Sequence, residues 1–200
     1  MKKLIYLVFP ILLSSCTMGT RFTYTYALLE PKQSNENKYG DEIISAKFKV
    51  DDEGVELEVT NLSDERISLL WNESTIVIKD EANAIIHAGL RYVDAGKDQI
   101  PSTIPPGAYI KDRAILINNL SYKPGDKYTR SGWVIKAMLP IWDLNNKKVR
   151  QRILDNKGQI VGLFVPIETQ EGIKEYYFKF KITDVQKYKH TPPTWKSIYE

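Results

Sequence analysis

Apolar and polar residues alternate along most of the chain. In the stretch GVELEVTN, Val55, Leu57 and Val59 alternate with two glutamates and a threonine. A period of two is typical of a strand with one buried face and one face in water. The same alternation, or a short apolar run, marks residues 22–28, 46–50, 55–59, 67–71, 76–78, 86–92, 109–117, 133–139, 159–167 and 173–185. About ten short strands separated by turns predict an all-β sandwich or barrel.

Polar segments separate the predicted strands. Residues 51–54, with the sequence DDEG, fall between two strands of matching phase and predict a hairpin turn. The acidic side chains of this turn are also candidate calcium ligands, although other oxygen ligands at regular spacing are missing, which favours the turn. Residues 31–42 are polar and predict an exposed loop.

One stretch departs from the strand pattern. In WDLNNKKVRQRILDNKG, Leu144, Val149 and Ile153 are near helical spacing, with Asp143 as a candidate N-cap and Gly158 as a stop. We therefore expect one short helix within residues 143–157. It is also basic, with Lys147, Lys148, Arg150 and Arg152. This charge fits contact with a partner or with lipid headgroups, but a solvated face is the favoured interpretation.

Two short motifs narrow the fold class. The run LEVTNLSDERI, in which a strand reaches an asparagine and a polar turn, is followed by IPPG at residues 104–107. This combination loosely resembles immunoglobulin-like modules of bacterial cell surfaces over residues 48–117. The resemblance implies an immunoglobulin-like β-sandwich rather than a closed barrel.

The first sixteen residues have the layout of a signal peptide. Lys2 and Lys3 precede ten residues without a charge or polar amide, and Ser14 and Ser15 lead into Cys16, the one cysteine of the chain. The apolar run is too short to span a bilayer, which takes about 20 apolar residues. This pattern resembles the lipobox of bacterial lipoproteins. The resemblance implies a diacylglycerol thioether on Cys16, cleavage before it and acylation of the new amine. The alternatives are a cleaved soluble protein and an uncleaved anchor with an incidental cysteine.

The anchor hypothesis sets the expected organisation of the chain. We expect residues 1–15 to be the cleaved signal peptide, 16–42 the lipidated N-terminus with a first strand and polar loop, 43–186 the sandwich, and 187–200 a C-terminal tail. Two or three acyl chains attach a protein durably, whereas one gives reversible binding. In Gram-negative lipoproteins an aspartate after the cysteine often marks inner-membrane retention, and Thr17 stands there instead. We therefore expect a monomer in the cell envelope, at the outer membrane if there is one, facing the periplasm or the surface.

Charge excludes one class of partner. Removing Lys2 and Lys3 lowers the formal net charge from +3 to +1. Nucleic-acid-binding domains usually carry a clear basic excess. Nucleic acid is therefore not an expected partner, and the overall charge also gives little support for attraction to anionic lipid.

Sequence motifs give little support to catalysis. The two histidines, His87 and His190, are too few for a zinc site of their own, and the chain has neither H-E-x-x-H nor C-x-x-C. Nucleotide-binding and G-x-S-x-G motifs are also missing. His87 alternates away from Ile86, so we expect it near solvent on a strand face. We expect no metal and no cofactor.

Aromatic residues are the remaining indication of binding. We single out five as candidate contact residues: Tyr24, Tyr26, Tyr188, Trp195 and Tyr199. Pro192 and Pro193 favour an extended tail, which could pack on the sandwich or meet a partner. We therefore expect a lipid-anchored envelope protein that acts by binding an envelope protein or glycan, as an accessory or assembly factor. The alternative is an envelope hydrolase with an unrecognised active site.

Overall fold

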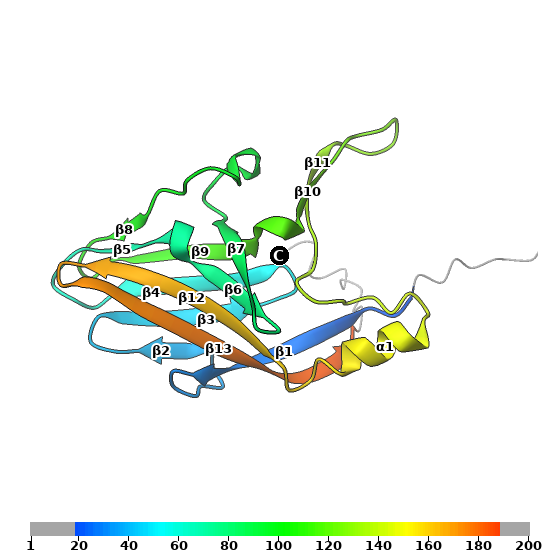
Figure 1. The fold of residues 1–200 in the computed structure, drawn as a ribbon, viewed down its shortest axis with the longest axis horizontal. Coiled ribbons are helices and arrows are strands. Elements are labelled where there is room, and N and C mark those ends of the chain that lie inside the picture. Colours follow the sequence, from blue (N-terminus) through cyan, green and yellow to red (C-terminus); the bar gives the residue numbers. More distant parts are fainter. Residues whose placement is uncertain (1–18, 189–200) are drawn as a thin grey trace, which may run out of the picture.

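The computed structural model describes residues 19–188, and these form an all-β architecture with one short α-helix (Figure 1). The strands are β1 (Phe22–Glu30), β2 (Lys38–Gly40), β3 (Ile44–Val50), β4 (Gly54–Asn61), β5 (Ile67–Leu69), β6 (Thr75–Ile78), β7 (Glu81–His87), β8 (Ser102–Ile104), β9 (Tyr109–Leu116), β10 (Leu120–Lys123), β11 (Gly132–Ile135), β12 (Ile160–Thr169) and β13 (Gly172–Lys187). The helix α1 spans Lys147–Leu154. The predicted helix between residues 143 and 157 is confirmed.

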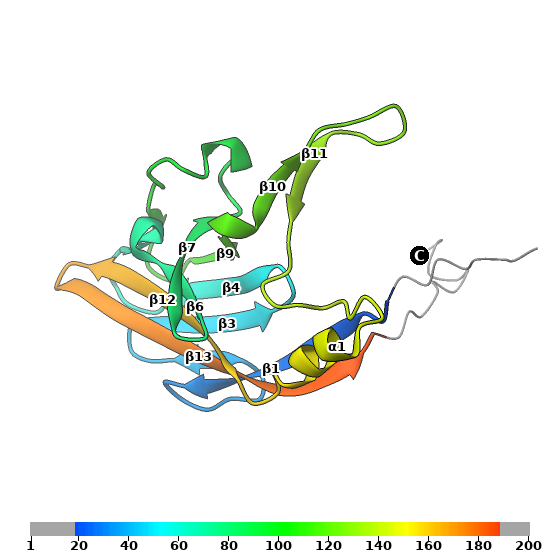
Figure 2. The ribbon, with the colours of Figure 1, turned by 45° about the vertical axis from the view of Figure 1, so that its right-hand side comes forward.

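The strands form two facing layers. Antiparallel pairing runs in the order β1-β13-β12-β6-β7-β9-β4-β3-β2, and β5 joins β12 to β8. Although β3 and β13 lie far apart on this path, the Phe48 ring is 4.5 Å from the ring of Phe178 and 5.3 Å from that of Phe180, between centroids. The sheet therefore folds over on itself near the β6–β7 hairpin (Figures 1 and 2). The predicted all-β, sandwich-like fold is confirmed.

The core lies between the layers, and the alternation of the sequence determines which residues enter it. On β4, Val55, Leu57 and Val59 are buried while the residues between them keep contact with solvent. On β13, alternate residues from Tyr176 to Ile182 are buried in the same way. Outward residues on β3 and β4 face each other in pairs such as Lys47 and Glu58, whose charged atoms are 2.7 Å apart.

Three local predictions were wrong. The segment 31–42 is exposed or partly exposed, as predicted, but it is not all loop, because it contains β2, which pairs with β3. Strand β7 ends at His87, and Ile85, Ile86 and His87 are buried in succession because β7 passes from β6 to β9 where the sheet folds over. The helix N-cap is Asn146, whose side chain accepts hydrogen bonds from two backbone amides of the first turn.

Asp41 joins the two layers at their open edge. It follows β2, and its carboxylate accepts hydrogen bonds from the backbone amides of Ile43 and Ile44 at 2.9 and 2.8 Å. From β13, Lys174 and the Tyr176 hydroxyl donate to the same carboxylate at 2.9 and 3.0 Å. Burial would raise the pKa of Asp41, but these donors outweigh it and lower the pKa to about 2.

We predict that Leu57→Asp unfolds the protein whereas Glu58→Lys is nearly silent. Leu57 is buried between the layers, so an aspartate there loses apolar burial and puts an unpaired carboxyl in the core, at a cost of at least about 3 kcal/mol. The partly exposed Glu58 loses one surface ion pair, worth less than about 1 kcal/mol. Thermal melting by circular dichroism measures both. Equal shifts of the two melting midpoints would contradict the strand phase.

A second prediction concerns acid stability. Because the pKa of Asp41 is lowered in the fold, its contribution is complete above the ordinary carboxyl pKa near 4 and disappears as the pH falls towards 2. Asp41→Asn should therefore lower the free energy of unfolding at pH 7 by about 1–2 kcal/mol, and by progressively less below pH ~4. Urea titrations at several pH values test this. The neighbouring exposed variant Glu42→Gln should match the wild type at pH 7, and a pH-independent deficit in Asp41→Asn would refute the assignment.

Candidate functional site

Two of the candidate contact residues lie in the core. Tyr24 and Tyr26 are on the inward face of β1 and are buried. The Tyr24 hydroxyl donates to the carbonyl of Pro140 and accepts from the Asn156 amide at 3.0 Å. Burial raises the pKa of both hydroxyls. Both rings are covered by the sandwich, which removes them from the surface available to a partner.

The other candidates lie at or beyond the end of the described chain. The backbone amide of Tyr188 donates to the Arg21 carbonyl at 2.8 Å, and the Arg21 guanidinium lies 4.7 Å from the centre of the Tyr188 ring. Tyr188 therefore packs beside the start of β1. Trp195, Tyr199 and Cys16 lie outside the described residues.

His87 is buried, and the prediction that it lies near solvent was wrong. It is 8% exposed, and its Nδ1 is 2.7 Å from Oδ2 of Asp112. The ring stacks on Trp71 with centroids 5.0 Å apart, and a Cβ on Gly89 would come within 2.7 Å of the ring. Within residues 19–188, no serine or threonine hydroxyl is hydrogen-bonded to this imidazole. A carboxylate and a stacked indole thus hold the ring in place without a nucleophile.

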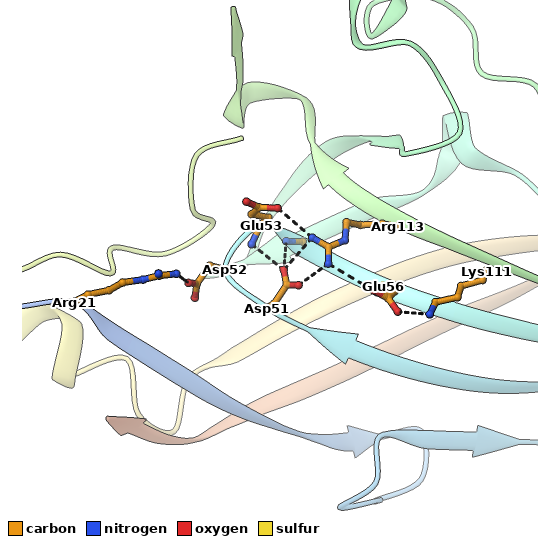
Figure 3. Close-up of polar contacts among 8 residues, drawn as sticks. Arg21, Asp51, Asp52, Glu53, Glu56, Lys111 and Arg113 are labelled. Carbon is orange, nitrogen blue, oxygen red and sulfur yellow. Dashed lines mark hydrogen bonds and ion pairs between the residues drawn. The ribbon is translucent and has the colours of Figure 1, made fainter. Parts of the chain in front are cut away.

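The acidic turn between β3 and β4 is neutralised by cations from other strands (Figure 3). Asp51 accepts hydrogen bonds from the backbone amides of Glu53 and Gly54, which closes the hairpin as predicted. The surrounding ion pairs are Arg113 with Asp51, Glu53 and Glu56, Lys111 with Glu56, and Arg21 with Asp52. In the part of the chain that the structure describes, no group of three or more His, Cys, Asp or Glu side chains is placed to hold a metal ion. The turn therefore works as a junction between strands.

A largely exposed hairpin projects from the sandwich (Figure 1). Residues 120–135, called the arm below, contain β10 and β11, which pair only with each other in a two-stranded sheet. Figures 1 and 2 both show the arm extending away from the two layers. At its base, the backbone amide of Lys136 donates to the Asn119 carbonyl at 2.9 Å.

An aromatic ridge lies on the arm. Tyr122 and Trp133 are directly opposite each other across the two strands, with ring centroids 5.7 Å apart. Tyr92, in the short 3₁₀ segment Tyr92–Asp94, approaches Trp133 edge-on at 6.1 Å. Tyr122 and Trp133 are nevertheless 55% and 42% exposed. These two rings are thus much more exposed to solvent than the aromatic rings of the core. Exposed apolar patches often mark interaction sites.

The tip of the arm is closed by hydrogen bonds to Asp126 and is basic. The Asp126 carboxylate accepts hydrogen bonds from the backbone amides of Tyr128 and Thr129 at 2.8 and 2.7 Å, which lowers its pKa. Asp126 is the one acidic residue between positions 120 and 136. The cations of the same stretch are Lys123, Lys127, Arg130 and Lys136. The arm therefore presents aromatic rings within a positive field.

Sequence reasoning missed the arm, although signals for it were present. The Pro124–Gly125 dipeptide is a strong turn marker, and Tyr122 and Trp133 stand on either side of it. Instead, residues 133–139 were predicted to be a sandwich strand, whereas the strand ends at Ile135 and belongs to the separate arm sheet. An alternating pattern does not reveal which neighbour will cover the apolar face.

Comparisons with known proteins add no assignment. No protein-family model matches the chain, and no curated protein or solved structure shows significant similarity to it. The resemblances to lipoproteins and to immunoglobulin-like surface modules therefore stay predictions. Within residues 19–188, no helix has the length and apolar character needed to cross a membrane.

Proposed function

We propose that this protein is a lipid-anchored component of the bacterial cell envelope that works by binding another envelope protein through its arm. The lipobox-like sequence ending at Cys16 supports the anchor. The exposed Tyr122–Trp133 pair on a projecting hairpin is the observation that carries the binding function.

The physics of a two-stranded hairpin favours this role for the arm. Isolated hairpins are only marginally stable in water, and β10 and β11 form four residue pairs. Tyr92 covers one edge of Trp133, while the rest of the ridge remains open. Trp, Tyr and Arg residues are enriched among those that contribute most to protein interfaces. A partner that covers the ridge would bury both rings and hold the arm in its extended position.

The charge of the arm defines the chemistry of the partner. With three cations and one carboxylate, and with Lys136 directly after it, the arm would attract an acidic surface. Complementary charge accelerates association and selects partners. We therefore expect the partner to be a protein whose contact surface has an apolar centre surrounded by acidic residues.

The alternative, an envelope hydrolase, has weaker support. It would require His87 to activate a nucleophile, and the ring is instead enclosed between Trp71 and the close approach of Gly89. Asp112 orients the imidazole, but a catalytic triad also needs a nucleophile hydrogen-bonded to the other side of the ring. Binding is the function that this geometry supports best.

The anchor hypothesis predicts that the wild-type chain incorporates labelled palmitate in a bacterial host and partitions into detergent. Cys16→Ala should abolish the label and leave a soluble or uncleaved chain, because the thioether has no other sulfhydryl to form on. Gel autoradiography and mass spectrometry of the N-terminus measure this. A wild-type chain without label would refute the anchor.

The binding hypothesis predicts that Tyr122→Ala combined with Trp133→Ala lowers capture of the partner at least about tenfold, since interface hot spots contribute about 2 kcal/mol or more. The measurement is crosslinking in intact envelopes, followed by purification of the tagged chain and quantification of the crosslinked protein. Because both rings are on the arm, the melting midpoint of the sandwich should be unchanged.

Tyr109→Ala provides the matched control. Tyr109 is 65% exposed but lies on β9 of the sandwich. Its loss should leave capture at the wild-type level. Equal losses from the arm and Tyr109 variants, or no loss from the arm variant, would contradict the proposed role of the arm.

A further inference from the structure

The segment 141–144 lies directly against the point where the described chain begins. The backbone amide of Phe22 donates to the Ile141 carbonyl at 2.7 Å, and Arg21 pairs with Trp142 in an antiparallel bridge. Gly19 is so close that an added Cβ would come within 2.4 Å of the Leu144 backbone nitrogen. A membrane or a partner next to the N-terminal end of the described chain would therefore also be next to residues 141–144.

Two apolar side chains at this end are exposed to solvent, one of them partly and one largely. Trp142 is 37% exposed, and Leu144 is 73% exposed with a backbone φ of 49°. A leucine in the left-handed region is uncommon, because its Cβ crowds the backbone there. The conformation is held by Asp143, whose carboxylate accepts hydrogen bonds from the amides of Thr20 and Asn145 at 2.7 and 3.0 Å. The fold thus uses a buried aspartate to keep Leu144 turned outward.

Cations follow immediately on α1. Lys147, Lys148 and Arg152 are exposed and make no ion pair with any residue of the described chain, whereas Arg150 is bound to Asp143 at 2.6 Å. Two of the three free cations occupy the first helical turn, where positive charge opposes the helix dipole. Helix stability therefore does not explain their position. Figures 1 and 2 both show α1 beside the start of β1.

We propose that Trp142, Leu144, Lys147, Lys148 and Arg152, called the anchor face below, dock on the anionic headgroup region of the bilayer that holds the lipid anchor. This inference rests on the proposed function, since the anchor determines which end of the domain meets the membrane. Cys16 precedes Gly19 by three residues, so their Cα atoms are at most about 11 Å apart.

The composition of the anchor face fits a bilayer surface. Tryptophan is enriched at the membrane–water interface, and leucine inserts favourably among acyl chains. Lysine and arginine are attracted to anionic lipid within about one Debye length of the surface. A tether this short leaves little room for a folded protein partner between the anchor face and the membrane. The short tether therefore favours the bilayer, rather than a protein, as the surface that contacts the anchor face.

Quenching of tryptophan fluorescence tests the anchor face. The full chain, purified in the N-terminal form that the host cell makes, is combined with phosphatidylcholine vesicles containing roughly one-third phosphatidylglycerol and acyl chains brominated on the phosphatidylcholine. Trp142→Phe should lower the quenched signal at least about twofold. Trp133→Phe, on the arm, is the matched control and should keep the quenching of the wild type. The fully buried Trp71 and the fourth tryptophan, Trp195, are unchanged in all samples, so the difference between variants reports Trp142 and Trp133 alone.

A charge variant tests the electrostatic part. Changing Lys147, Lys148 and Arg152 to glutamine should shift the docking equilibrium at least about tenfold towards the undocked state, so that quenching in anionic vesicles falls to the level in neutral ones. Lys79, in the turn between β6 and β7, and Lys181, on β13, are both exposed. They are changed to glutamine as the control, which should have no effect. Quenching that is identical in anionic and neutral vesicles would overturn the proposed attraction to anionic headgroups.

Mass spectrometry of the same N-terminus separates this inference from the proposed function. A lipidated chain in which Trp142 is not quenched overturns the anchor face and leaves the anchor intact. Quenching of Trp142 in a chain without lipid supports the anchor face and refutes the anchor. A chain with neither lipid nor quenching refutes both.

Discussion

The pairing of β1 with β13 brings the two ends of the described chain together. Phe22 is opposite Lys187 at one end of this antiparallel ladder, so the first and last described strands begin and end together. The ladder continues to Glu30 and Lys179, with two register shifts, one after Thr25 and one after Leu28. Because β1 also places Phe22, Tyr24, Tyr26 and Leu28 in the core, it cannot detach without exposing them. The N-terminal end is consequently fixed to the body of the fold.

Much of this architecture could be predicted from alternation alone. The phase of β4 and β13 follows from the two-residue period, since every second side chain must leave water. The turn at residues 51–54 and the helix within 143–157 were also marked by local chemistry, namely a cluster of turn-forming residues and apolar positions near helical spacing. These features depend on residues that are close together in the sequence. Patterns in a single sequence can therefore indicate them.

Features that depend on distant neighbours could not be predicted. His87 lies where β7 leaves one layer for the other, and the residues that cover it, Trp71 and Asp112, are 16 and 25 positions away. Asp143 is a residue type that often caps helices, yet its carboxylate accepts a hydrogen bond from the backbone amide of Thr20, 123 positions away. Asn146 is the N-cap instead. Tyr122 and Trp133 look like core residues in sequence, and they remain exposed because no third strand joins the arm.

The arm and the anchor face belong to one continuous stretch of chain, from Leu120 to Leu154. Between them, the stretch is fastened to the sandwich: the Met138 amide donates to the Asp52 carbonyl at 2.7 Å, and the Pro140 carbonyl accepts from the Tyr24 hydroxyl. The fastened part cannot rotate independently of the layers. Docking of the anchor face on a bilayer would therefore orient the whole sandwich, and with it the direction in which the arm leaves the fold. In this arrangement the lipid would set the location of the protein, and the chemistry of residues 141–152 would set the side from which a partner can reach Tyr122 and Trp133.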